Sequence, residues 1–240
     1  MGEQTLEKRD LCYEGKAKKM YSTNLPDKLW VEFKDDATAF DGEKKATLRR
    51  KGILNQAISA HLFQVLEEKG IETHFLESLG TEEMLVKHLE VIPVEFIVRN
   101  YAAGGISRRL GISEGKEFSP PIMEFCLKDD ELKDPMINHH HIKYLQLASS
   151  QEMEEMSTMA FRINQVLFPY FESKGIILVD FKLEFGRYQG KILLGDEITP
   201  DTCRFWDRDT GEKLDKDIFR QGKEGLTDAY QEVLKRLQWD

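Results

Sequence analysis

Residues 177–200 read ILVDFKLEFGRYQGKILLGDEITP, and the first half of this stretch alternates strictly between apolar and charged side chains. Successive side chains of a β-strand point to opposite faces, so the spacing predicts a strand with one apolar face. The opposite face carries an acid, a base and an acid, namely Asp180, Lys182 and Glu184. A merely solvated face has no reason to align charges in this way, so we expect these three side chains to serve a functional site.

The same stretch continues as a predicted hairpin. A turn containing Gly186 and Gly190 follows the first strand, and a second apolar strand covers 191–194. A hairpin of this form brings Glu184 and Asp196 to the same end of the sheet. Carboxylates that converge around a lysine suit Mg²⁺ and the phosphates that it carries. The sequence therefore predicts Glu184 and Asp196 as metal ligands.

Composition restricts the class of protein. The chain has 240 residues, enough for one large domain or two small ones, with 40% hydrophobic and 32% charged residues. The net charge of −9 argues against broad nucleic-acid binding, although a local basic cluster could still bind a small anion. Three widely spaced cysteines form neither a disulfide framework nor a zinc pattern, which favours the reducing cytoplasm. No apolar run approaches the roughly 20 residues that span a bilayer, and residues 1–10 lack the apolar core of a secretory signal.

Along the chain, the first 45 residues read as strands and turns, and we expect a domain boundary near residue 85. This gives a β-rich N-terminal domain, 1–85, and a larger second domain, 86–240. The helices and strands that the spacing predicts are a helix over 47–69 ended by Gly70, a strand over 91–98 interrupted by Pro93 and Glu95, a short helix over 106–110, a helix over 151–174 and a helix over 225–237.

Two segments of the second half carry further local signals. Ser149 and Glu152 form a capping box for the helix over 151–174. Pro169 lies inside that helix and predicts a kink or an early stop. Residues 126–150 are polar and are interpreted as a long surface loop. It contains His139–His141, but consecutive histidines on a loop cannot all reach one ion and no further ligand completes a zinc site.

The segment Gly15-Lys16-Ala17-Lys18 is a candidate phosphate-binding element. On a strand, Lys16 and Lys18 share one face, and Gly15 lets a ligand approach the backbone closely. Two ammonium groups beside an exposed amide suit a triphosphate. The segment matches neither a P-loop nor a dinucleotide fingerprint, and a plain solvated strand is the alternative.

Glu95 and Arg99 lie in or at the end of an apolar run, and Ala102-Ala103-Gly104-Gly105 follows. Burying a charge is costly unless the charge is paired, so both side chains are expected at a site. Arginine binds phosphate or carboxylate with two parallel hydrogen bonds, and the glycines allow a turn whose N–H groups face an anion. The alternative is a structural Glu95–Arg99 pair.

Two further arginines, Arg204 and Arg220, follow the acidic hairpin. Their plain interpretation is a solvated loop arginine for Arg204 and a helix-capping charge for Arg220. The functional interpretation places both side chains in contact with the substrate.

Read together, these segments resemble one family closely, the SAICAR synthetases (phosphoribosylaminoimidazole-succinocarboxamide synthases) of purine biosynthesis. The matching segments run in family order and are YEGKAKKMY (13–21), KDDATAFDG (34–42), RKGILN (50–55), VIPVEFIVRNYAAGG (91–105), DPM (134–136), LVDFKLEFG (178–186) and GDEITPDTCRFWD (195–207).

The resemblance implies an α+β fold (an α/β two-domain, SAICAR synthetase-like architecture). It has a β-rich antiparallel N-terminal domain, a larger α/β C-terminal domain, and ATP in the cleft between them. It implies a ligase that uses ATP and Mg²⁺ to join L-aspartate to the carboxylate of 5-amino-1-(5-phospho-D-ribosyl)imidazole-4-carboxylate (CAIR). A carboxyl phosphate is the implied intermediate. It also implies a homo-oligomer, expected as a homodimer. Composition adds the expectation of a cytoplasmic protein with no nucleic-acid or membrane partner.

Roles for individual residues follow from the same resemblance. Lys16 and Lys18, with the backbone of Gly15 and Ala17, are implied at the ATP phosphates. Asp180 and Lys182 are implied at the reacting carboxylate. Arg99 and Arg204 match the grip on the ribonucleotide phosphate, and Asp41 and Arg220 match positions near the substrate carboxylates. Gly105 stands where the family usually has a serine that binds this phosphate, so its backbone N–H remains and Ser107 is the candidate substitute.

Two other functions share part of this pattern. A small-molecule kinase would share the lysines and carboxylates but would need no aspartate pocket. A nucleotide-sensing protein without catalysis would keep Lys16 and Lys18 but could lose the acidic hairpin. Here Asp180, Glu184 and Asp196 are all present, which counts against the second alternative.

Overall fold

The strand predicted from residues 177–200 is the centre of the larger of the two main antiparallel sheets. In the computed structural model, which describes residues 5–39 and 44–238, this strand is β11 (Ile176–Tyr188). It pairs with β8 (Glu90–Tyr101), β12 (Lys191–Leu194) and β13 (Cys203–Asp207). The predicted apolar face is confirmed, because Val179, Phe181, Leu183 and Phe185 are all buried.

The hairpin differs from the prediction at Gly186. This glycine lies inside β11, and Gln189 and Gly190 form the turn. A β-carbon on Gly186 would lie 2.7 Å from Cβ of Leu89. Gly186 therefore permits a close approach of two chain segments within the sheet, which sequence spacing does not reveal.

The larger sheet continues through β9 (Glu117–Leu127) and β10 (Met136–Ile137), in the order β10-β9-β8-β11-β12. The predicted interruption of the strand over 91–98 is wrong, since β8 runs through Pro93 and Glu95. The pairing register with β11 jumps from Glu95 to Val91. Pro93 lies in this irregularity, where its missing N–H breaks no ladder hydrogen bond to β11.

The smaller sheet contains the N-terminal strands in the order β1-β2-β3-β7-β6. Its strands are β1 (Lys8–Glu14), β2 (Lys18–Thr23), β3 (Lys28–Phe33), β6 (Phe75–Ser78) and β7 (Glu83–Lys87). A two-stranded sheet, β4 (Asp36–Ala39) and β5 (Lys44–Thr47), lies beside it in the chain. The predicted boundary at residue 85 falls within β7, and the division into two domains stays a prediction.

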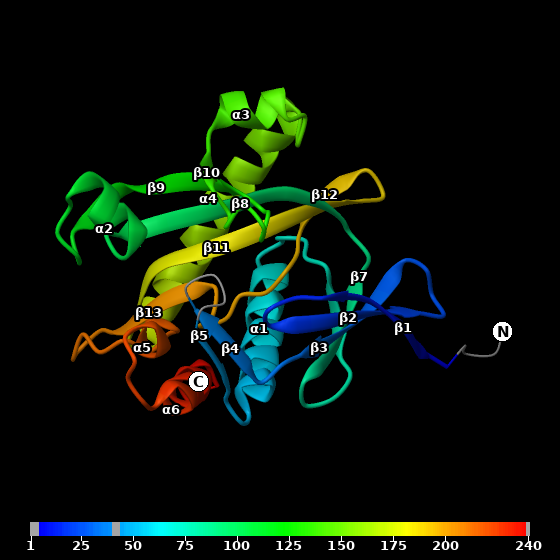
Figure 1. The fold of residues 1–240 in the computed structure, drawn as a ribbon, viewed down its shortest axis with the longest axis horizontal. Helices are drawn as coiled ribbons and strands as arrows, with labels where there is room; N and C mark the ends of the chain where they lie inside the picture. The colour runs from blue at the N-terminus through cyan, green and yellow to red at the C-terminus, as the bar shows by residue number, and fades with distance from the viewer. Residues whose placement is uncertain (1–4, 40–43, 239–240) are drawn as a thin grey trace.

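Two long helices provide much of the core. Helix α1 (Lys51–Glu68) contacts β3 and α6 (Leu226–Leu237), and α4 (Ser150–Ser173) packs on β11 and β8. Figure 1 shows α1 (cyan) between the blue strands and the red C-terminal helix, with the larger sheet above them in this view. The Ser149–Glu152 capping box is confirmed, and α4 runs past Pro169 to Ser173, so an early stop there is wrong.

The expectation of one long loop over 126–150 is wrong. The segment contains the end of β9, β10 and the short helix α3 (His139–Tyr144). Asn138 caps α3, because its side chain accepts hydrogen bonds from the N–H groups of His140 and His141. The histidines thus form a helical turn. Two other short helices, α2 (Gly105–Leu110) and α5 (Asp217–Arg220), border the functional site.

No helix in the described part of the chain combines the length and apolar character needed to cross a membrane.

Helix α1 approaches β3 closely at Gly52, and this contact gives a prediction about stability. A β-carbon at Gly52 would lie 2.6 Å from the carbonyl oxygen of Phe33. We expect Gly52→Ala to lower the free energy of unfolding by about 1–3 kcal/mol through overpacking, although alanine favours a helix by about 1 kcal/mol. Urea unfolding followed by circular dichroism measures the change. Gly80→Ala is the control, because its β-carbon would meet only Glu83 at 3.6 Å. Equal stability of the two variants would contradict the prediction.

Candidate active site

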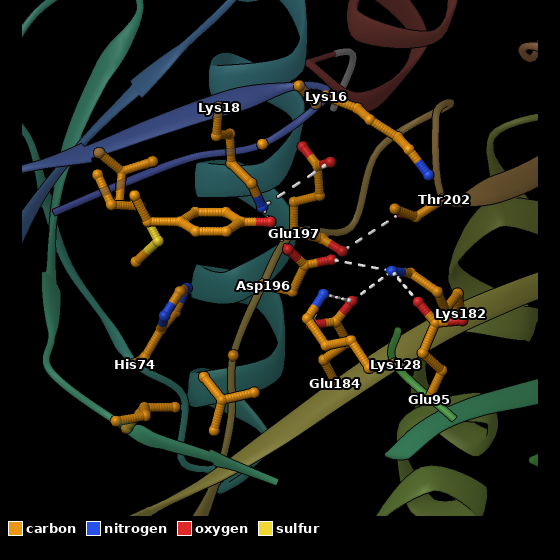
Figure 2. A pocket seen from close by; sticks show the side chains of 18 of the residues that line it. Lys16, Lys18, His74, Glu95, Lys128, Lys182, Glu184, Asp196, Glu197 and Thr202 are labelled. Carbon is orange, nitrogen blue, oxygen red and sulfur yellow. Dashed lines mark hydrogen bonds and ion pairs between the residues drawn. The ribbon is translucent and has the colours of Figure 1, made fainter. Parts of the chain in front are cut away.

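A cavity of about 570 Å³ lies between the two sheets. Its walls come from the β1–β2 turn, from β3, from the connection of β7 to β8, from β11 and from residues 195–202. Part of the lining is apolar and includes Met20, Leu29, Val31, Leu89 and Phe185. The charged lining residues gather together, as Figure 2 shows around Lys182. The cavity thus offers apolar surface beside a strongly charged region.

Lys182 occupies the centre of the charged region. Its Nζ atom lies 2.8 Å from Glu95 Oε1 and 3.6 Å from Asp196 Oδ2, and it also donates to Glu184. Strand β11 supplies Lys182 and Glu184, β8 supplies Glu95 opposite Glu184, and Asp196 follows β12. The predicted meeting of Glu184 and Asp196 is confirmed, and the group at which they meet is an ammonium.

Electrostatics hold this lysine in its charged form. Burial lowers the pKa of Lys182, but attraction from Glu184, Asp196 and Glu95 outweighs burial and leaves the pKa well above its ordinary value. For Glu95, burial raises the pKa more than Lys182 lowers it. The result is one permanent cation among three carboxyl groups.

Lys18 connects the smaller sheet to the same group. It lies on β2 and donates to Asp196, and its Nζ lies 3.8 Å from Glu197 Oε1. Burial raises the pKa of Asp196, but Lys18, Lys182 and Lys128 outweigh burial and hold it well below its usual range. Asp196 also adopts a left-handed backbone conformation with φ of 57°, which is uncommon for a residue other than glycine. Local backbone geometry thus aims this carboxylate.

Two lysines lie on either side of this centre. Lys128, which the sequence analysis missed, lies 2.9 Å from Glu184 Oε2. Lys16 lies 2.6 Å from Asp130 Oδ1. Both lysines line the cavity, but Lys16 lies in the turn before β2, so the prediction that it shares a strand face with Lys18 is wrong. Gly15 and Ala17 lie in this turn and also line the cavity.

A second charged cluster, made of arginines and carboxylates, surrounds Asp180, which lies two residues before Lys182 on β11. Asp180 accepts hydrogen bonds from Arg99 NH1 at 2.6 Å and from Arg204 NH1 at 2.9 Å. Asp217 accepts from Arg204 Nε at 3.0 Å and from Arg220 NH1 at 2.5 Å. The alternative of a Glu95–Arg99 pair is wrong, because these side chains bond to Lys182 and Asp180 respectively. Asp180 is buried and does not line the cavity. Its carboxylate instead holds two arginine side chains in place.

The remaining predicted residues lie near these arginines or outside the described structure. Gly105 and Ser107 lie on α2, and Ser107 Oγ is buried without a hydrogen-bond partner among the described residues. Asp41 belongs to the residues that the structure does not describe.

A buried polar group supports the loop of residues 195–202 from below. Asp201 accepts hydrogen bonds from Lys51 on α1, from Asn55 at 2.9 Å and from Tyr230 Oη on α6 at 2.7 Å. Lys51 is only 1% exposed. Burial raises the pKa of Asp201, but Lys216 and Lys51 outweigh burial and lower it. Sequence patterns gave no signal for this group, because its members are distant in the chain.

The donor set fits a magnesium ion that also binds phosphate. Among the described residues, no group of three or more His, Cys, Asp or Glu side chains is arranged to hold a metal alone. Glu184 and Asp196 nevertheless present carboxylate oxygens around one point, at Lys182. Mg²⁺ commonly takes one or two protein carboxylates and completes its coordination with substrate phosphates and water. These two residues suit that kind of site.

Comparison with known proteins identifies close relatives. The family described as SAICAR synthetase matches residues 11–237. The phosphoribosylaminoimidazole-succinocarboxamide synthase of Coprothermobacter proteolyticus is 57% identical over 233 residues, which cover 97% of this chain and 99% of that protein. The crystal structure of the synthase from Ehrlichia chaffeensis is 44% identical, covers 95% of this chain and 98% of that one, and superposes with a TM-score of 0.93. A SAICAR synthetase in complex with ADP is 51% identical, with a TM-score of 0.91 and coverage of 94% and 97%.

Glu197 beside this site gives a pH prediction. Its side chain is buried, its Oε2 has no hydrogen-bond partner among the described residues, and burial raises its pKa from 4.5 to about 6. A raised folded-state pKa means that the stability it contributes is present below pH 4.5 and is lost as the pH rises through about 6. We therefore expect Glu197→Gln to gain stability relative to the parent chain by about 1–2 kcal/mol between pH 4 and pH 8.

Urea unfolding at a series of pH values measures this difference. Glu77→Gln, which removes an exposed carboxylate on β6, controls for the loss of one charge. A Glu197→Gln difference that stays constant from pH 4 to pH 8 would exclude the titration.

Proposed function

The chain belongs to the SAICAR synthetase family, and from that premise we propose how its own residues perform the reaction. The protein is an ATP-dependent ligase that joins L-aspartate to the carboxylate of CAIR, giving SAICAR, ADP and phosphate. The single observation that carries the assignment of residues is Lys182, a partly buried cation held among three carboxyl groups in a cavity between two sheets.

The nucleotide occupies the cavity in this proposal. Its base lies against the apolar lining around Leu29, Val31 and Phe185, and its phosphates lie toward Lys16, Lys18 and Lys128. Pockets for nucleotides combine apolar walls with a few placed polar groups. Lysine ammonium groups act as point charges for phosphate, and Gly15 and Ala17, in the same turn as Lys16, also line the cavity.

Glu184 and Asp196 hold the magnesium ion in this arrangement. When bound, Mg²⁺ neutralises phosphate charge and orients the transferred group. Lys182, Lys18 and Lys128 already contact these two carboxylates. These lysines therefore hold the two carboxylate side chains in position before any substrate arrives.

Lys182 also neutralises the imidazole carboxylate of the substrate. The carboxylate attacks the γ-phosphorus of ATP, ADP leaves, and a carboxyl phosphate forms. The aspartate amine then attacks the carboxyl carbon and loses a proton, and phosphate leaves. Positioning and charge neutralisation dominate such a transfer. Arg99 and Arg204, aligned by Asp180, bind the ribose phosphate, and Arg220 acts at the substrate carboxylates, a role that the resemblance also gives to Asp41.

Assembly and location complete the proposal. The resemblance supports a homodimer, which sedimentation velocity would test. The three cysteines are free thiols, which suits the reducing cytoplasm, and fractionation of cells that express the protein would test this location.

An omission assay tests the function directly. ATP, magnesium, L-aspartate and CAIR are mixed with the protein, and ADP and succinocarboxamide are measured with each component left out in turn. All four should be required, with isotope from labelled L-aspartate entering the product. A small-molecule kinase would release ADP without aspartate, and a nucleotide sensor would release none. Activity that persists in excess EDTA would refute the role of magnesium.

Lys182 should be more important for turnover than for nucleotide affinity. Lys182→Met removes the cation that sits at the reacting carboxylate, so we expect kcat to fall at least about 100-fold with a much smaller change in KM for ATP. Lys191→Met provides a matched control on the neighbouring strand, where the lysine is exposed and pairs with Glu72. A Lys182→Met variant that raises KM for ATP and keeps kcat would reassign Lys182 to nucleotide binding. Circular dichroism verifies that both variants fold.

A further inference from the structure

We propose that Arg109 is a third arginine that binds the phosphate of the ribonucleotide substrate, beside Arg99 and Arg204. This inference rests on the proposed function, which places that phosphate at the arginine cluster. Arg109 is the last but one residue of α2, and no sequence signal distinguished it from Arg108.

The first argument is where its guanidinium lies. A β-carbon on Gly105 would be 2.6 Å from Arg109 NH1. The Arg109 guanidinium therefore lies directly against the backbone of residue 105, in space that a β-carbon there would make it leave by a small shift of its flexible side chain. The preceding residue repeats the arrangement, since a β-carbon on Gly104 would be 2.6 Å from Arg204 NH2. Two guanidinium groups thus lie against two consecutive glycines.

The second argument is how the arginines are connected. Glu124 on β9 accepts from Arg109 NH2 at 2.5 Å and from Arg99 Nε at 2.6 Å. Asp180 in turn accepts from Arg99 and Arg204. Glu124 therefore links Arg109 to Arg99, and Asp180 links Arg99 to Arg204. Glu124 fixes Arg109 beside Arg99 much as Asp180 fixes Arg204.

The third argument is charge and hydrogen-bonding capacity. With Asp217, which accepts from Arg204, and Arg220, which donates to Asp217, the cluster has four arginines and three carboxylates, and its net positive charge of +1 attracts a phosphate group of about −2. A guanidinium has five N–H donors. Among the described residues Arg109 bonds only Glu124, and it does so through NH2, which leaves NH1 at Gly105 to meet an anion. Arginine binds phosphate oxygens with this planar fork.

A purely structural role is the competing explanation. The Arg109 side chain is 40% exposed, and an exposed ion pair contributes little to stability. The two explanations differ in what they predict for the substrate phosphate, because a structural ion pair would not affect binding of that group selectively.

The experiment measures KM for CAIR, ATP and L-aspartate in four variants of the full chain. Arg109→Ala should raise KM for CAIR roughly tenfold or more, the loss of a charge-assisted hydrogen bond, and leave KM for ATP and L-aspartate unchanged. Arg109→Lys should be impaired too, since it keeps a cation beside Glu124 but loses the fork. Arg108→Ala, an exposed arginine on the same helix turn, should match the parent chain.

Gly105→Ala provides an independent variant that leaves Arg109 in place in the sequence. Gly105 has no positive φ and begins a helix, so alanine suits the backbone and should not destabilise it. Its methyl group makes the flexible guanidinium shift, so Gly105→Ala should raise KM for CAIR by less than Arg109→Ala does. The double variant should be no worse than Arg109→Ala alone.

A substrate without the phosphate separates direct binding from indirect effects. With the nucleoside that corresponds to CAIR, Arg109→Ala and the parent chain should have equal kcat/KM, and inorganic phosphate should inhibit Arg109→Ala more weakly. Full rescue by Arg109→Lys, or equal losses with nucleotide and nucleoside, would overturn the proposal in favour of a structural ion pair. Turnover by the parent chain tests the proposed function separately, because an inactive parent chain refutes that function before any variant is compared.

Discussion

The site depends on one partly buried cation that three acidic side chains surround. Burying a carboxylate is costly without a partner, and Glu95, Glu184 and Asp196 share the ammonium of Lys182. Each comes from a different segment, so the cation fixes the relative positions of β8, β11 and the chain after β12. Lys18 then joins the smaller sheet to Asp196. The two walls of the cavity are thus connected through charges that the substrates also need.

In the arginine cluster the charges are reversed, because carboxylates there lie between guanidinium groups. Asp180 and Glu124 each hold two guanidinium groups, as Lys182 holds carboxylates. Side chains fixed in this way need little rearrangement when an anion binds, and preorganised charge is the main source of catalysis in such sites. Because Asp180, Lys182 and Glu184 alternate on β11, one strand carries both the carboxylate that holds the arginines and the carboxylate proposed to bind the metal, at a fixed separation.

Sequence reasoning succeeded where a strict period or a local motif carried the information. The alternation of residues 177–185 gave β11, its buried face and the meeting of Glu184 with Asp196. It failed where contacts between residues far apart in the sequence determine the structure. Gly186 reads as a turn residue, but its place inside β11 depends on Leu89. Lys128 belongs to a polar segment that reads as loop, and only the fold brings it to Glu184. No sequence pattern predicts that Lys51 and Asp201, far apart in the chain, pair in the core.

The buried Lys51–Asp201 ion pair fixes the backbone of the loop that carries Asp196. A buried ion pair rarely stabilises a protein more than apolar residues of similar volume would, so stability alone does not explain it. Asp201 also accepts from Asn55 and Tyr230, and these partners lie on α1 and α6. Directional bonds from two helices fix the backbone at Asp201 in a way that apolar packing does not. Asp196 lies five residues earlier with φ of 57°. Anchoring the loop at Asp201 therefore helps to keep the Asp196 carboxylate aimed at Lys18 and Lys182.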